Sequence, residues 1–117
     1  MIILKTPRQY AEFVSWNIFP YINLLKKSYI TNVANYSKVS EEFLNVKLVD
    51  SLLSDIELIL KKKIINTTAK IVTLKFSEAE AITLYRIFLN LPVPKDDYYF
   101  GLVRNNWIEI LDQQIFK

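Results

Sequence analysis

Histidine and cysteine are both absent from this chain of 117 residues. Their absence excludes disulfide bonds and zinc sites of the usual Cys/His kind. It also excludes nucleophilic catalysis by a Ser–His or Cys–His pair, because such a pair needs an imidazole base. Carboxylates are therefore the main candidates that remain for acid–base chemistry.

Glycine occurs once, at Gly101, and this scarcity limits both the fold and the ligands. A β-sandwich or barrel with many tight turns needs more residues that can adopt positive φ, so helices are favoured. The glycine-rich phosphate-binding motifs GxGxxG and GxxxxGK[ST] each contain more than one glycine. Neither motif can be written with this sequence.

Long apolar runs are missing as well. The longest uncharged run, Phe13 to Leu25, is interrupted by Ser15, Pro20 and Asn23. It is too short and too polar to span a bilayer. No positively charged region of a secretory signal opens the chain. We therefore expect an intracellular, cytoplasmic protein without a membrane partner.

The sequence does contain a large share of apolar residues. Hydrophobic residues make up 51% of the chain and charged residues 23%, which is too apolar for intrinsic disorder. The length suits one domain with its own core, so we predict a single domain over residues 1–117. The frequent use of Lys, Asn, Ile, Tyr and Phe is typical of an AT-rich genome, such as that of a bacterium, phage or organelle.

The first helix is predicted to begin at Thr6. Thr6 would be its N-cap, Pro7 its first residue and Gln9 the partner of Thr6 in a capping box. Pro20 lies inside the apolar pattern that follows and should kink or split this helix near Ile18–Phe19.

Three further helices are predicted from apolar residues that recur every three or four positions. Ser40 would cap the first of them, and Lys61–Lys63 would close it. Ser77–Glu80 is a capping box that opens the next, and Asp96 or Asp97 can cap the last. The expected inner faces are Phe43, Val46, Val49, Leu52, Leu53, Ile56, Ile59 and Leu60; then Ala81, Leu84, Tyr85, Phe88 and Leu89; then Tyr99, Phe100, Val103, Trp107, Ile110, Leu111 and Ile115.

Two short segments predict strands. Ile2–Lys5 is β-branched, and Ala69–Phe76 alternates apolar with polar residues. Each segment directly precedes a predicted helix, and the two could pair into a small ribbon. The predicted fold class is mainly α, formally α+β: a compact bundle of four to five helices with a minor two-stranded β element.

The acidic residues are the candidates for catalysis. Asp50, Asp55 and Glu57 fall on the second predicted helix, and Glu109 and Asp112 on the last. Asp50 and Asp55 lie about 140° apart around a helix, so they do not share a face. A catalytic pair needs two carboxylates that face each other across a pocket. We interpret these residues as solvated surface and predict no catalytic, cofactor or metal site, so the chain is not expected to be an enzyme.

The densest positive cluster is Lys61, Lys62 and Lys63, with Lys70 and Lys75 nearby. Such lysines could neutralise phosphates of a nucleic acid. The triplet also has a local explanation, because cations stabilise the C-terminal end of a helix. Arginine, the usual residue for reading bases, occurs only three times. A small nucleic-acid-binding accessory protein that uses this cluster is therefore the alternative function.

The densest aromatic region lies in the last predicted helix. Tyr98, Tyr99 and Phe100 are consecutive, so they cannot all face one core. This helix is apolar around much of its circumference, which suits either the centre of the bundle or an interface with a partner. The interface candidates are Tyr98, Tyr99, Phe100, Leu102, Arg104, Trp107 and Ile108.

Arg86 and Arg104 each lie within an otherwise apolar helix. Each is expected to reach solvent or to pair with an acid such as Glu109, and recognition of a phosphate or carboxylate is the alternative. The preferred functional interpretation is a non-catalytic interaction or assembly protein. It would be a small oligomeric structural or accessory subunit of phage or mobile-element origin that binds a protein partner, self or foreign.

Overall fold

The computed structural model describes residues 1–25 and 41–116, with side chains for residues 1–25 and 47–116. Two strands pair into a small sheet and the other elements are helical, which confirms the predicted mainly α fold with a minor β element. The elements, in chain order, are β1 (Ile2–Pro7), α1 (Arg8–Phe13), the π-helical segment η1 (Val14–Ile18), a helical continuation over residues 19–25, α3 (Glu41–Asn66), β2 (Ile71–Phe76), α4 (Glu78–Asn90) and α5 (Tyr98–Ile115).

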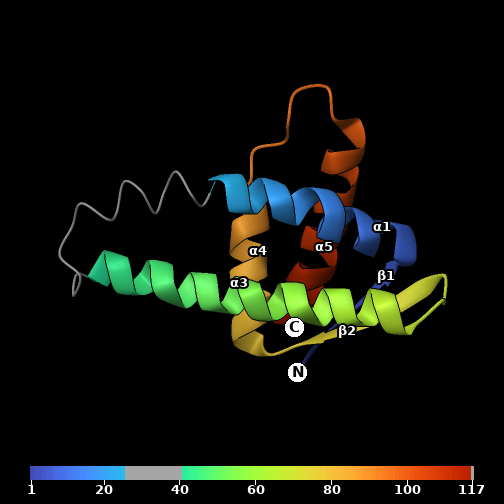
Figure 1. Cartoon of the computed structure of the whole chain (residues 1–117), viewed down its shortest axis with the longest axis horizontal. Helices are drawn as coiled ribbons and strands as arrows, with labels where there is room; N and C mark the ends of the chain where they lie inside the picture. Colours follow the sequence, from blue (N-terminus) through green and yellow to red (C-terminus); the bar gives the residue numbers. More distant parts are fainter. Residues whose placement is uncertain (26–40, 117) are drawn as a thin grey trace.

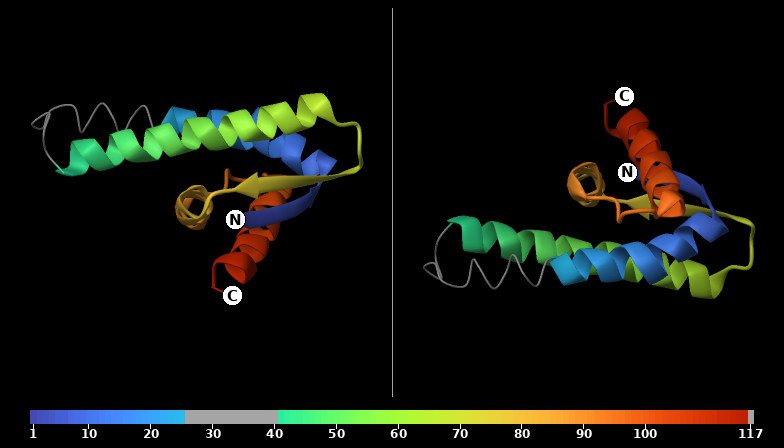
Figure 2. Two further views of the ribbon diagram at one scale, coloured as in Figure 1. Left: turned by 90° about the horizontal axis from the view of Figure 1, so that it is seen from below. Right: turned by 90° about the horizontal axis from the view of Figure 1, so that it is seen from above.

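The helices and the sheet are stacked in layers. Both views in Figure 2 show α1 and α3 side by side in one layer, with α4, α5 and the strand pair on one side of it. The buried apolar side chains of these elements form one core. Figure 1 shows α3 crossing α4, with the N-terminal end of α3 extending beyond it. That extension matters for the surface described below.

The two predicted strands pair with each other, and the structure shows that they are antiparallel. Leu4 lies opposite Leu74, and Thr6 lies opposite Val72. All four side chains are buried, because alternate residues of a strand point to the same face and this face covers the core. The opposite face of the sheet is exposed at Lys5 and Lys75 and half-buried at Thr73.

The predicted start of the first helix is wrong. Thr6 belongs to β1, and Pro7 occupies the N-cap position without a side-chain cap. The backbone N–H of Arg8 instead donates to the carbonyl of Lys70, 2.7 Å away, so the turn before β2 satisfies this helix end. The strand pair therefore determines the use of Thr6 and Pro7, and the local capping pattern does not.

Pro20 does not split the helix at Ile18–Phe19, because helical structure continues over residues 19–25. The helix is irregular directly before this point, where Val14–Ile18 forms a π-helical turn. A proline ring collides with the carbonyl four residues before it, and a widened turn relieves that contact.

The predicted caps of the last two helices are confirmed. Ser77 Oγ accepts a hydrogen bond from the N–H of Glu80, and Glu80 Oε1 accepts one from the N–H of Ser77. Asp97, the second of the two predicted alternatives, caps α5 by accepting from the N–H of Phe100. The predicted cap of α3, Ser40, lies outside the described residues.

Trp107 lies at the centre of the core. Its indole is fully buried and stacks on Phe88 of α4, with ring centroids 5.8 Å apart. The indole N–H donates to Thr6 Oγ1 at 3.0 Å, so a buried polar pair joins α5 to β1. Three predicted core positions differ from this arrangement: Leu89 is 49% exposed, Tyr99 is 38% exposed and Val49 is 37% exposed.

Arg8 holds the C-terminal end of α3. Its guanidinium donates to the carbonyl of Ile64 at 2.8 Å and to the carbonyl of Thr67, and it pairs with Glu12 at 2.7 Å. The last carbonyls of a helix have no partner within the helix, and cations are favourable at that end. The sequence placed Lys61–Lys63 in this role, yet α3 continues past them to Asn66.

Replacement of Thr6 by valine tests the buried hydrogen bond. Valine keeps the shape of threonine but leaves the indole N–H of Trp107 without its acceptor. We expect the free energy of unfolding to fall by about 1–3 kcal/mol, because a buried donor without a partner is costly. Thr6→Ser, which keeps the hydroxyl, is the matched variant. Urea unfolding followed by circular dichroism gives both values, and equal stability of Thr6→Val and the wild type would contradict the role of this bond.

Replacement of Arg8 by glutamine tests the cap of α3. We expect the free energy of unfolding to fall by about 1–3 kcal/mol, because the charge-assisted hydrogen bonds to the carbonyls of Ile64, in α3, and Thr67, just after it, are lost. Arg86→Gln is the control, since the Arg86 guanidinium has no hydrogen bond or ion pair within the described residues. Thermal unfolding should separate the two variants. A similar melting temperature for both would show that Arg8 does not stabilise the end of α3.

Candidate interaction site

The aromatic interface candidates are divided between core and surface. Phe100 and Trp107 are buried, so their rings belong to the core and present no surface. Tyr98 is 89% exposed, and Leu102 is 47% exposed. Tyr99 is 38% exposed, since its ring packs edge-on against those of Tyr10 and Phe13. Burial, and to a lesser extent the nearby Tyr10, raises the pKa of Tyr99.

The other two candidates on α5 have structural contacts. Ile108 is partly buried against the core. Arg104 donates to the carbonyl of Leu91 at 2.8 Å, and so caps the end of α4 instead of pairing with Glu109. α5 thus packs against α4 and β1 through one buried face. Its exposed apolar surface is confined to its first turns.

The lysine candidates all lie on the surface. Lys61, Lys62 and Lys63 are exposed on the last turns of α3, and Lys61 Nζ lies 3.9 Å from Glu57. Lys70 directly precedes β2, and Lys75 lies on its outward face. Because α3 packs against β2, the two groups of lysines lie on neighbouring elements.

Lys5 joins the lysine candidates, although the sequence interpretation did not include it. In the sheet register, Lys5 lies opposite Thr73 and Ile3 lies opposite Lys75. Lys5 and Lys75 are therefore diagonal neighbours on the exposed face, with their side chains about 7–8 Å apart at the base. Only the pairing of β1 with β2 reveals this proximity.

The candidate carboxylates of the described residues differ in their surroundings. Asp55 and Glu109 are exposed, and Glu57 pairs with Lys61. Asp112 accepts a hydrogen bond of 2.8 Å from the hydroxyl of Tyr85, and this bond is the main reason that the pKa of Tyr85 is raised; burial and the charge of Asp112 add to it. Within the described residues, no three acidic side chains are grouped so that they could hold a metal ion.

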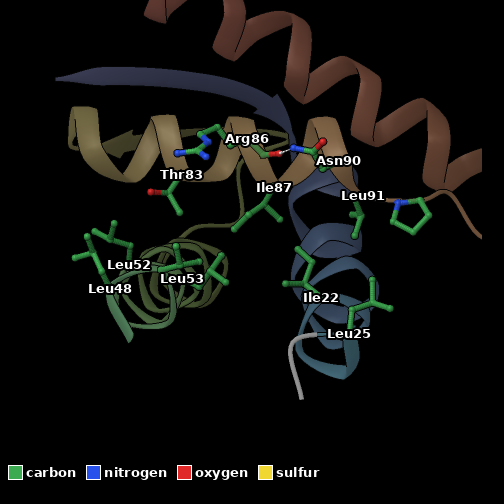
Figure 3. Close-up of a pocket in the computed structure, with 12 residues that line it drawn as sticks. Ile22, Leu25, Leu48, Leu52, Leu53, Thr83, Arg86, Ile87, Asn90 and Leu91 are labelled. Atoms are coloured by element: carbon green, nitrogen blue, oxygen red, sulfur yellow. Dashed lines mark hydrogen bonds between the residues drawn. The ribbon is translucent and has the colours of Figure 1, made fainter. Parts of the chain in front are cut away.

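A large apolar groove lies where α3, α4 and residues 19–25 meet, and we call it the α3–α4 groove. Its volume is about 900 Å³. Figure 3 shows Ile87 of α4 pointing into the space between Leu53 of α3 and Ile22. The full lining is Ile22, Leu25, Leu48, Val49, Leu52, Leu53, Thr83, Arg86, Ile87, Asn90, Leu91 and Pro92.

Several apolar residues of this lining are open to solvent. Leu48 is 60% exposed, Leu25 is 40% exposed and Val49 is 37% exposed. The polar residues all come from α4: Thr83, Arg86 and Asn90. The Asn90 amide donates to the carbonyl of Arg86 at 2.8 Å, as the dashed line in Figure 3 marks. Among the described residues of the lining, Arg86 is the one that carries a charge, and its side chain is exposed.

The groove follows part of the long helix α3. With 26 residues, α3 is about 39 Å long. α4 crosses α3 near its middle (Figure 1), and among the lining residues of α3, Leu48 and Val49 are exposed and Leu52 is half-buried. The apolar pattern of the sequence identified Val49 and Leu52 as inward-facing. The pattern did not show that Val49 would remain exposed, and Leu48 was not among the predicted residues.

Within residues 1–25 and 41–116, no helix is long and apolar enough to cross a membrane. No protein-family model matches the chain, no curated protein has a significantly similar sequence, and no solved structure is significantly similar to it. What the protein does must therefore be inferred from its surface.

Proposed function

We propose that this chain is a non-catalytic interaction protein and that the α3–α4 groove is the surface that binds its protein partner. One observation carries the proposal: a groove of about 900 Å³ with apolar side chains left exposed, Leu48 at 60% and Leu25 at 40%. Burial of a leucine side chain contributes about 1.5–3 kcal/mol. A partner that covered these residues would gain that free energy.

The shape of the groove supports a helical partner segment. The lining comes from three helical elements that leave a channel between them, with Ile87 at its floor (Figure 3). Amphipathic helices commonly bind in apolar grooves of this kind, with side chains spaced three and four residues apart as anchors. The wider interpretation, an accessory subunit of a phage or mobile element, is part of this proposal and rests on the composition of the chain.

The first turns of α5 are a smaller candidate surface. Tyr98 and Leu102 are exposed there, and tyrosine is common at the centre of protein interfaces. The next positions along the same stripe, Asn105 and Glu109, are polar and exposed. This stripe of α5 therefore offers less apolar area than the groove. We propose that it contributes at most the edge of a protein interface.

Charge placed in the groove tests the proposal. Leu48→Glu puts a carboxylate on the wall of the groove, and Leu58→Glu puts one on the same helix at a 52% exposed position outside it. We expect Leu48→Glu to lower the amount of partner that co-purifies from the source cells by about tenfold or more, since that loss corresponds to about 1.4 kcal/mol. Leu58→Glu should retain the partner.

A second matched pair guards against an effect specific to one position. Leu25 lines the groove and its neighbour Leu24 does not, although Leu24 is the more exposed of the two, at 66%. Leu25→Glu should weaken co-purification and Leu24→Glu should not. All four variants should unfold at wild-type temperatures. Equal losses for lining and non-lining variants would count against the groove.

Nucleic-acid binding is the second candidate, and the placement of Lys5 beside Lys75 favours it. Both lysines are on the exposed face of the sheet, and Lys70 directly precedes β2. Phosphate contacts of this kind give affinity without base recognition. The surface suits a duplex or strand backbone and would act independently of the α3–α4 groove.

Charge reversal at Lys75 tests this second candidate. If the sheet face binds phosphates, Lys75→Glu should weaken a gel mobility shift at low salt and reduce the salt dependence of the affinity. Lys95→Glu changes the net charge equally but lies on the connection between α4 and α5, so it should have little effect. If wild-type protein gives no shift at low salt, or if both variants lose binding equally, the sheet face is not a nucleic-acid site.

A further inference from the structure

We infer that the occupant of the α3–α4 groove is an amphipathic helix of another protein, and that it carries a carboxylate that pairs with Arg86. This inference rests on the function proposed above and identifies the class of partner. It follows from the combination of an apolar lining with one cation, from the way that cation differs from the other arginines, and from the position of Arg86 on α4.

Arg86 differs from the other two arginines of the chain in what it contacts. Arg8 donates to the carbonyls of Ile64 and Thr67, and Arg104 donates to the carbonyl of Leu91. The guanidinium of Arg86 has no hydrogen bond or ion pair with any residue that the structure describes. Its donors are therefore available to a partner.

The described lining of the groove carries a positive charge, at Arg86. Arg86 is the one ionisable residue in the part of the lining that the structure describes, and the other polar members there, Thr83 and Asn90, are neutral. A guanidinium binds a carboxylate through two parallel hydrogen bonds, and the pair is stronger where a bound partner excludes water. A partner with a cation at this place would meet repulsion, so an acidic residue is the complementary choice.

Arg86 lies on the same helix as the apolar floor of the groove. Ile87 follows it directly, and Leu91 lies at the end of α4. A helix that lies across Ile87 and Leu53 would place one flank of its apolar stripe beside Arg86. On that helix the acid would stand next to the apolar anchors, at the border between its apolar and polar faces.

A phosphate-rich partner fits the groove poorly. Nucleic acids and anionic membranes are bound by several cations together, and the described lining residues include one cation, Arg86. A nucleic acid would also leave Leu48, Leu25 and Val49 without apolar contacts. The lining therefore favours a partner that is mostly apolar with a single acid.

Selection from a displayed library of helix-forming peptides tests the inference without a known partner. The full-length chain is the target, and the Leu48→Glu variant is used to remove peptides that bind elsewhere. We expect enriched peptides with apolar residues at helical spacing and one Asp or Glu at a fixed position beside them. The same selection on Arg86→Gln should keep the apolar pattern and lose the acid.

Affinities of one selected peptide then measure the pairing. Its Glu→Gln version should bind wild-type protein about fivefold more weakly, the effect of a partly exposed ion pair. The Glu and Gln versions of the peptide should bind the Arg86→Gln variant with equal affinity, because that variant has already lost the ion pair. Lys62→Gln, which removes an exposed cation outside the groove, should leave the fivefold difference intact.

The outcomes separate this inference from the function on which it rests. Apolar helical peptides selected without a fixed acid would overturn the role of Arg86 and leave the groove as a binding surface. No enrichment over Leu48→Glu would overturn both. Self-association of the wild-type chain in sedimentation, abolished by Leu48→Glu, would identify a second copy as the occupant. Binding of a fatty acid that depends on Arg86, with no peptide selected, would identify a lipid as the occupant. Self-association or fatty-acid binding would each overturn the inference.

Discussion

The hydrogen bond from the indole N–H of Trp107 to the hydroxyl of Thr6 joins the last helix to the first strand inside the core. A buried donor must be paired, so this bond fixes how α5 is rotated against β1. The same indole stacks on Phe88 and thereby orients α4. Arg104, one turn before Trp107, then reaches the carbonyl of Leu91 at the end of α4. The end of α4 that lines the groove is thus positioned by contacts that begin at Thr6.

The groove lies along residues 48–53 of α3. α3 is anchored at its C-terminal end, where Arg8 donates to the carbonyl of Ile64 and to that of Thr67 just beyond the helix, and where β2 packs against it. Its core-facing residues from Leu53 to Ile64 are covered, while Leu48 and Val49 lie nearer its N-terminal end and are exposed. Apolar side chains of α3 that stay in contact with water raise the free energy of the unbound protein. A partner that completes the cover removes this cost, which is why we regard the open part of the face as functional.

Sequence patterns predicted what depends on neighbouring residues. The capping box of Ser77 and Glu80 and the cap at Asp97 involve residues three positions apart, and both were identified correctly. Thr6 was assigned to a helix cap because its bond to Trp107, across 101 positions, leaves no local pattern. The role of Arg8 and the proximity of Lys5 to Lys75 also depend on contacts between distant segments. For the same reason, the sequence pointed to α5 as the contact surface and could not reveal the groove.

Thiol reactivity offers the most direct test of whether the groove is occupied. The chain has no cysteine, so Leu48→Cys and Leu58→Cys each create a single thiol, at positions that are 60% and 52% exposed. In the purified chain both should react with a maleimide at similar rates. In the source cells, the thiol at position 48 should react several-fold more slowly relative to that at position 58, because the partner covers the groove. An unchanged ratio of rates would contradict the proposal that this protein works through the α3–α4 groove.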